Sequence, residues 1–173
     1  MSDGRSRGKA HRFGGDWTAS KLQVVGEYLK AYTTALKGAS FKTAYIDAFA
    51  GTGYRTLTET DGVQQLFEPL AEEAPQELLD GSARIALKTE PRFDRYIFVE
   101  RHRERARELT GLRSEFAHLA NDIVVVRNDA NAAIQDLCRK DWSKRRAVLF
   151  LDPYGMQVEW KTIEAIAGTK AID

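Results

Sequence analysis

Residues 45–53 read YIDAFAGTG, an apolar run that contains one acid, Asp47, and ends in Gly-x-Gly. An apolar run that stops at glycines predicts a buried strand followed by a tight turn. Because glycine has no Cβ, the backbone at Gly51 and Gly53 can pass close to another group. The N–H groups that open the next element can then face a polar or anionic ligand. The segment therefore predicts a strand that leads into a ligand-binding turn.

Further apolar runs alternate with segments of helical spacing along the chain. We expect strands at residues 44–49, 95–100, 123–126 and 147–151, with helices before, between and after them. This alternation predicts an α/β fold: a Rossmann-like parallel central sheet with helices on both faces. The run at 123–126 is β-branched throughout, so we expect both of its faces to be covered. Residues 170–173 resemble the start of a fifth strand. Without that strand the fourth would be an uncovered apolar edge, which favours aggregation. We therefore expect that the domain is truncated after its fourth strand.

The composition is typical of a globular protein and favours the cytoplasm as its location. Its 173 residues fit one domain, and a net charge of +1 neither requires nor excludes a nucleic-acid partner. The single cysteine, Cys138, excludes an internal disulfide and a cysteine metal site, and it fits a reducing cytoplasm. No apolar run approaches the roughly 20 residues of a membrane span. The basic N-terminus has no apolar segment behind it, so it does not predict a signal peptide.

Charge divides the chain into a tail, a domain and an insertion. Residues 1–15 are basic and rich in glycine and serine, which predicts a flexible tail that either contacts phosphate or only solubilises the chain. Residues 16–173 form the expected domain. Within it, residues 54–80 are mostly acidic and predict an insertion after the first strand. An insertion there would lie over the carboxyl edge of the sheet, where lids and substrate loops occur.

The four expected strands all end at acids or glycines. In chain order these candidate site residues are Asp47 with Gly51, Thr52 and Gly53, then Glu100, Asp129, and Asp152 with Tyr154. Each has a simpler interpretation on its own: a tight turn, the start of a solvated helix, a helix N-cap and a proline turn. Together they match the needs of a nucleoside-containing cofactor. Such a ligand requires glycines for close backbone approach, an acid for the ribose hydroxyls and a polar group near the adenine amine.

The glycine pattern separates the types of cofactor. Residues 51–56 read GTGYRT, so the third glycine of a dinucleotide site is absent, and no Gly-Lys-Ser or Gly-Lys-Thr of a P-loop occurs. The pattern fits S-adenosylmethionine. Residues 47–53 (DAFAGTG) resemble the first motif of class I methyltransferases, in a variant common among enzymes that act on nucleic-acid bases. Residues 152–155 (DPYG) are similar to the fourth motif of amino-methyltransferases, but with one proline and an aromatic residue one position early.

Most of residues 17–173 resemble the bacterial three-Cys-motif partner family. The resembling segments are Trp17 with Lys21, then 45–53, 81–83, 98–100, 129–131, 150–155, 158–160 and 170–173. The resemblance implies a methyltransferase fold, S-adenosylmethionine as cofactor and a separate three-Cys-motif protein as partner. It assigns Asp47, Gly51, Thr52 and Gly53 to the amino-acid part of the cofactor, Glu100 to the ribose and Asp129 to the adenine amine. Asp152 would lie by the sulfonium, and Tyr154 would stack on a planar substrate, DNA or RNA.

Two other functions stay open at this point. The first is a cofactor-binding partner of a three-Cys-motif protein that has no catalytic activity. The second is a nuclease or nucleotidyl transferase that uses acids and a metal, although the acids lack paired spacing. The histidines are scattered without metal-ligand spacing, and we expect no metal. Ser82 is best interpreted as a helix cap. Trp142, near Lys140, Lys144, Arg145 and Arg146, offers an alternative nucleic-acid surface.

Overall fold

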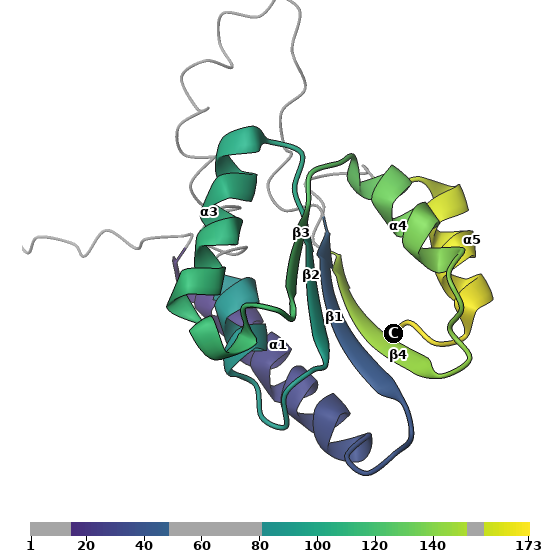
Figure 1. The fold of residues 1–173 in the computed structure, drawn as a ribbon, viewed down its shortest axis with the longest axis horizontal. Helices are drawn as coiled ribbons and strands as arrows, with labels where there is room; N and C mark the ends of the chain where they lie inside the picture. Colours follow the sequence, from purple (N-terminus) through teal and green to yellow (C-terminus); the bar gives the residue numbers. More distant parts are fainter. Residues whose placement is uncertain (1–14, 49–80, 152–157) are drawn as a thin grey trace, which may run out of the picture.

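The computed structural model describes residues 15–48, 81–151 and 158–173 (Figure 1). Several predictions concern the remaining residues: the basic tail, the acidic insertion, the turn with Gly51, Thr52 and Gly53, and the pair Asp152 and Tyr154. All of these lie outside the described residues. The first helix begins at Gly15, the last residue of the expected tail.

Four parallel strands form one sheet. They are β1 (Lys42–Ala48), β2 (Arg95–Val99), β3 (Ile123–Val126) and β4 (Arg145–Leu151), in the order β3-β2-β1-β4. The predicted parallel α/β architecture, compatible with a Rossmann-like fold, is confirmed at this level. Both β1 and β4 begin two residues earlier than predicted, because Lys42 pairs in register with Arg145 and Thr43 with Arg146. Polar residues at strand starts carry no apolar signal, so the sequence pattern misses them.

Helices cover both faces of the sheet (Figure 1). On one face lie α1 (Gly15–Ala35), the helical residues 81–88, and α3 (Arg103–Glu115), which is followed by the short η2 (Ala117–Leu119). On the other face lie α4 (Ala130–Cys138) and α5 (Trp160–Thr169). After α1 the chain turns at Gly38, whose φ of +86° is a left-handed conformation that glycine adopts without strain.

Each face has its own apolar cluster. The larger lies beneath α1 and α3 and includes five buried aromatic side chains, Tyr45, Phe93, Tyr96, Phe98 and Phe116. Phe93 packs edge-on against Tyr96, with 5.9 Å between the ring centroids, and Tyr45 packs edge-on against Phe98. The smaller cluster joins Val99 and Ala48 to Ile134 of α4 and to Ile166 of α5. The two clusters fix the sheet between its helix layers.

The expectation that both faces of β3 are covered holds in part, since Val125 packs against the larger apolar cluster and Val126 against the smaller one. Ile123 is buried, but the next three valines are only half-buried. Among the described strands, β3 lies at the edge of the sheet and pairs only with β2, so fewer neighbours cover its faces. A run of β-branched residues therefore identifies the strand but not its place in the sheet.

The last residues of the chain run alongside β4. Ile172 forms a parallel bridge with Ala147, and the N–H of Leu149 donates to the carbonyl of Asp173 over 2.7 Å. This is the backbone pairing that the expected start of a fifth strand requires. It places residues 171–173 on the side of β4 opposite β1.

The strand order defines where a ligand would bind. From β1 the chain continues to β2 and β3 on one side, and then crosses over to β4 on the other side. In open parallel sheets, ligands bind beyond the carboxyl ends of the strands at the point where the order reverses, here between β1 and β4. Within residues 15–48, 81–151 and 158–173, no helix has the length and hydropathy of a membrane span.

Candidate functional site

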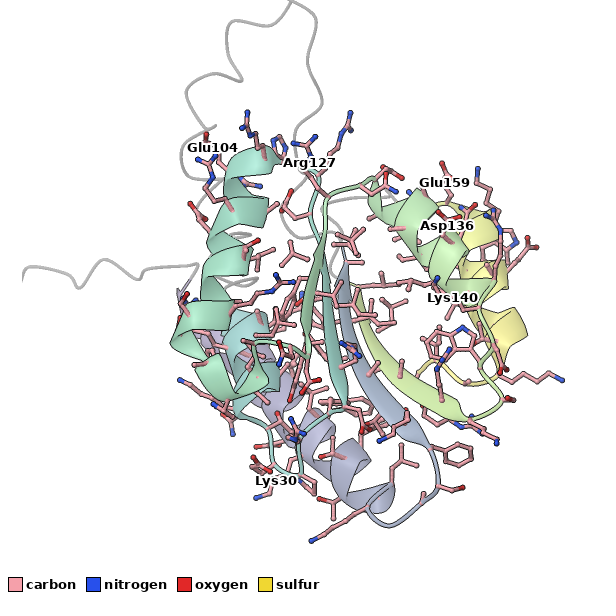
Figure 2. All side chains as sticks on the ribbon, viewed as in Figure 1. Lys30, Glu104, Arg127, Asp136, Lys140 and Glu159 are labelled. Atoms are coloured by element: carbon pink, nitrogen blue, oxygen red, sulfur yellow. The ribbon has the colours of Figure 1, made fainter. Side chains whose placement is uncertain are left out.

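Three of the predicted site residues lie at the carboxyl edge of the sheet. Asp47 is the second-last residue of β1, Glu100 follows β2 directly, and Asp129 lies between β3 and α4. Because the strands are parallel, their carboxyl ends meet at one edge. Figure 2 labels Arg127, which follows β3, and Glu104, in the first turn of α3, at this same end of the molecule. The fold therefore brings acids from three separate chain segments to one edge.

Glu100 is the most unusual of the three. Its side chain is buried, with 1% of its surface exposed. Its backbone N–H donates to the carbonyl of Val126, which continues the pairing of β2 with β3 by one residue. Its Oε1 atom accepts a hydrogen bond of 2.7 Å from the N–H of His102, the N-cap residue of α3. Backbone and side chain together hold this carboxylate in one orientation.

The second oxygen of Glu100 has no hydrogen-bond partner among the described residues. Oε2 is buried, and no donor within the described part of the chain reaches it. Burial raises the pKa of the Glu100 carboxyl group, while the N–H of His102 and the positive charge of Arg105 act in the opposite direction. Buried polar atoms are nearly always hydrogen-bonded, and each exception calls for an explanation such as a ligand. Glu100 thus has an acceptor available for an external donor.

Asp47 is held in a different way. It is buried, and its Oδ2 atom accepts hydrogen bonds from the Tyr45 hydroxyl over 3.0 Å and from the Ser82 hydroxyl over 2.6 Å. Burial and the Asp47 carboxylate raise the pKa of Tyr45 well above its ordinary value, so the phenol stays a donor at neutral pH. The expectation that Ser82 caps a helix is wrong, because Ser82 lies within the helical residues 81–88 and its hydroxyl contacts Asp47. Asp47 anchors helical residues 81–88 to the carboxyl end of β1.

Asp129 is the N-cap of α4. Its carboxylate accepts a hydrogen bond of 3.1 Å from the N–H of Ala132, and the side chain is exposed. The simpler interpretation of this residue, as a helix cap, is therefore confirmed. A cap of this kind uses one oxygen and leaves the carboxylate at the surface. Its expected contact with an adenine amine remains a prediction.

Asn131 lies in residues 129–131, one of the segments that resemble the three-Cys-motif partner family, but the sequence predicted no role for it. Its side chain is buried, and Oδ1 accepts hydrogen bonds of 2.9 Å from the N–H of Glu159 and from the Thr162 hydroxyl. Gln135 of α4 donates to the same hydroxyl over 2.8 Å. This network joins the start of α4 to the start of α5, which Val158 and Glu159 separate from residues 152–157. The available signal in the sequence was one amide among the alanines that begin α4.

The alternative surface around Trp142 lies at the amino end of β4, opposite the carboxyl edge of the sheet. The Trp142 indole N–H donates to the carbonyl of Leu137, and the guanidinium of Arg146 lies 3.9 Å from the ring centroid of Phe41. Lys140, Trp142 and Arg146 line an open cavity of about 430 Å³, together with residues that end α5. Because this cavity is beside the amino end of β4, a substrate there would be remote from the candidate site at the carboxyl edge.

Across the three described ranges, no group of three or more histidine, cysteine or acidic side chains could hold a metal ion. Comparison of the chain with protein-family models, with curated proteins and with solved structures finds no match in any of the three. The case for a function therefore rests on the residues at the carboxyl edge.

Proposed function

We propose that this protein is a methyltransferase that uses S-adenosylmethionine and acts on nucleic acid, of the kind that the three-Cys-motif partner resemblance implies. A cytoplasmic location and a three-Cys-motif protein as partner belong to the same proposal. Three features support it: a parallel sheet whose strand order reverses between β1 and β4, acids at the ends of successive strands, and the predicted glycine turn after β1.

The observation that carries the proposal is the Oε2 atom of Glu100, which is buried and meets no donor from the described residues. A ribose presents two neighbouring hydroxyl groups, and each can donate a hydrogen bond to a carboxylate. A buried carboxylate held by one backbone N–H, with its other oxygen unmet, suits such a donor. Glu100 therefore fits the group that the resemblance assigns to it. The hydroxyl donors would also offset the desolvation that raises the pKa of Glu100.

The remaining roles follow from position. When bound, S-adenosylmethionine supplies a methyl group already activated by its sulfonium. The chain has to hold and orient it: Glu100 at the ribose, Asp129 at the adenine amine, and Asp47 with residues 51–53 at the amino-acid part. For Asp152 and Tyr154, which lie outside the described residues, the resemblance alone assigns places at the methyl group and at the substrate. Catalysis of this type depends mainly on positioning, with a carboxylate available to accept a proton.

Methyl transfer itself tests the proposal. The protein is incubated with S-adenosylmethionine carrying a radiolabelled methyl group and with cellular RNA, DNA or a three-Cys-motif protein, and label and S-adenosylhomocysteine are measured. We expect label in nucleic acid, its loss in Glu100→Gln, and its loss in Asp152→Ala with cofactor affinity kept within a few-fold. Cofactor binding with no turnover on any substrate would favour the inactive-partner function. Normal methylation by Asp152→Ala would contradict the role of that residue.

A further inference from the structure

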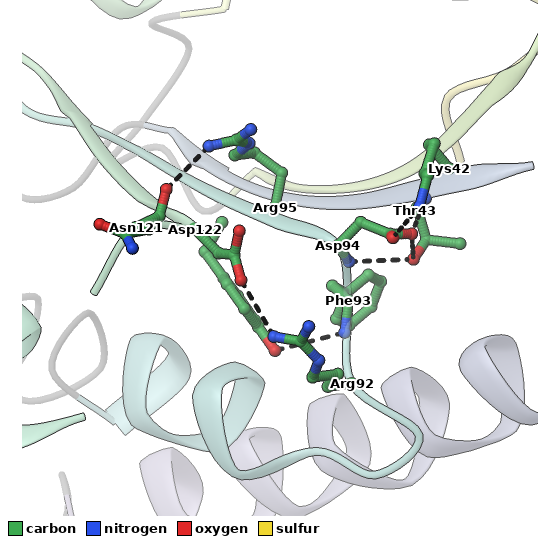
Figure 3. A network of polar contacts seen from close by, with 9 residues as sticks. Lys42, Thr43, Arg92, Phe93, Asp94, Arg95, Asn121 and Asp122 are labelled. Atoms are coloured by element: carbon green, nitrogen blue, oxygen red, sulfur yellow. Dashed lines mark hydrogen bonds and ion pairs between the residues drawn. The ribbon is translucent and has the colours of Figure 1, made fainter. Parts of the chain in front are cut away.

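Three cations at the amino ends of β1 and β2 are paired within the molecule (Figure 3). Lys42 forms an ion pair of 2.8 Å with Asp94, and Arg92 forms one of 2.9 Å with Asp122. Arg95 donates to the carbonyl of Asn121 over 2.9 Å. These contacts hold together the segments that precede β1, β2 and β3.

The carboxyl edge is different. Arg101 follows β2, Arg103 begins α3, and Arg127 follows β3, and all three side chains are exposed. We call these three residues the arginine rim. None of them has an ion pair or hydrogen bond to another side chain within the described ranges, whereas the neighbouring Arg105 lies close enough to lower the pKa of Glu100. Acids lie at this end as well: Figure 2 labels Glu104 near Arg127, and the exposed Asp129 follows Arg127 by two positions. Within the described chain, none of the three rim arginines is therefore held in an ion pair.

An exposed aromatic side chain lies at the other end of the same edge. Trp160 begins α5, next to residues 152–157, and 73% of its surface is exposed, the largest fraction among the exposed large apolar side chains of the described chain. Its indole N–H donates to Glu164 over 2.9 Å, which orients the ring on the helix. Exposing a tryptophan to this extent costs hydrophobic burial, unless a ligand covers the ring.

We propose that the arginine rim and Trp160 bind a single-stranded segment of nucleic acid, with the rim on its phosphates and Trp160 stacked on one of its bases. Cations that track a backbone, combined with an exposed aromatic ring, are the features that bind single strands. Cations alone would equally suit an acidic protein, and a duplex would keep its bases stacked away from the ring. This inference rests on the proposed function, because it places the substrate across the edge where Glu100 would hold the cofactor.

Charge at the rim is tested by fluorescence anisotropy with fluorescein-labelled 20-nucleotide RNA and DNA single strands at several salt concentrations. We compare the full protein with the triple variant Arg101→Ala, Arg103→Ala, Arg127→Ala. We expect at least about a tenfold weaker affinity and a salt slope smaller by about 2, since each phosphate contact on a single strand contributes about 0.7 to that slope. The control triple variant Lys30→Ala, Lys37→Ala, Lys88→Ala removes three exposed charges elsewhere and should bind within about twofold of the parent.

Stacking is tested separately. Trp160→Ala should weaken single-strand binding at least about fivefold with the salt slope unchanged, and Trp160→Phe should restore most of the affinity. Tyr28→Ala removes an exposed aromatic side chain of α1 and is the matched control. Tighter binding of RNA than of DNA, or the reverse, would identify which nucleic acid the surface takes.

Three results would overturn this inference: equal affinity of the parent and the rim variant, an effect of the lysine variant as large as that of the rim variant, or tighter binding to duplex than to single strands. Titration of the same variants with S-adenosylmethionine separates this failure from failure of the proposed function. Intact cofactor binding with no oligonucleotide binding contradicts the rim alone. Oligonucleotide binding through the rim without cofactor binding contradicts the methyltransferase.

Discussion

The hydroxyl of Ser82 donates a hydrogen bond of 2.6 Å to Oδ2 of Asp47, and both residues are buried. The contact ties helical residues 81–88 to the carboxyl end of β1, and the Tyr45 hydroxyl reaches the same oxygen over 3.0 Å. It thus fixes the strand end from which the predicted glycine turn departs. Hydrogen bonds to a buried carboxylate contribute more than neutral ones, because leaving the charge without donors is costly.

Substituting Ser82 by alanine should therefore destabilise the fold. We expect the free energy of unfolding in urea to fall by about 2 kcal/mol, since a charged acceptor loses a donor inside the protein. Ser143→Ala, at an exposed serine, is the control and should change it by less than about 0.5 kcal/mol. An unchanged midpoint for Ser82→Ala would show that Asp47 is satisfied without this contact.

Glu100 should be less stabilising than the neutral residue that replaces it. Because burial raises its pKa, the folded state holds its proton more tightly than the unfolded chain, whose ordinary value is 4.5. The contribution of Glu100 to the free energy of unfolding is therefore largest below pH 4.5. It falls as the pH rises through the raised pKa of the folded state. Glu100→Gln should remove that fall and raise the free energy of unfolding at pH 7 by about 1 kcal/mol.

Thermal unfolding of the parent and Glu100→Gln across the acid to neutral range measures this effect. The difference in Tm should grow with pH in favour of the variant, to about 2–4 °C at neutrality. A variant that is less stable than the parent at every pH would mean that the carboxylate is already satisfied.

Asp129 can be tested in its two roles with different substitutions. Asp129→Ala should cost about 1 kcal/mol, because the N–H of Ala132 loses its cap. Asp129→Ser keeps a capping oxygen and should keep the stability, but its shorter side chain should lose the adenine contact and weaken S-adenosylmethionine binding about tenfold. Full affinity in the serine variant would leave Asp129 a helix cap only.

Asn131 should control how firmly α5 is held at its start. Asn131→Ala removes the acceptor for the N–H of Glu159 and for the Thr162 hydroxyl, so we expect a loss of about 1–3 kcal/mol. Amide hydrogen exchange at Glu159 and Thr162 should accelerate in the variant. Asn121→Ala, at an exposed asparagine, is the control. Unchanged exchange at both amides would show that α5 is positioned by its apolar contacts alone.

The apolar periodicity predicted the layout of the sheet well, because each strand is an apolar run between polar segments. Residues 123–126 and 95–99 were located to within one residue for this reason. Lys42 and Arg145 were missed because their side chains are exposed at strand starts. The edge position of β3 could not be predicted from its own residues, since strand order depends on pairing between distant segments.

The candidate site was predictable as a set of strand ends but not as a set of contacts. Glu100 was identified by following an apolar run, yet its unmatched oxygen depends on the fold around it. The contact of Ser82 with Asp47 joins residues 35 apart in sequence, and the Asn131 contacts with Glu159 and Thr162 span 28 and 31 positions. No local pattern contains such information. In the sequence, Arg101 and Arg103 only mark the start of a charged helix. That Arg127 lies at the same edge of the sheet depends on the strand order.

Calorimetric titration of the protein with S-adenosylmethionine, beside Glu100→Gln, tests the central claim most directly. We predict saturable binding with a Kd in the micromolar range, weakened at least about tenfold in the variant, because the ribose hydroxyls lose a charged acceptor. The variant must unfold cooperatively with a Tm no lower than the parent, so that lost binding reflects the site. Absence of binding by the folded parent, or equal affinity in both proteins, would contradict the assignment of Glu100 and of the cofactor.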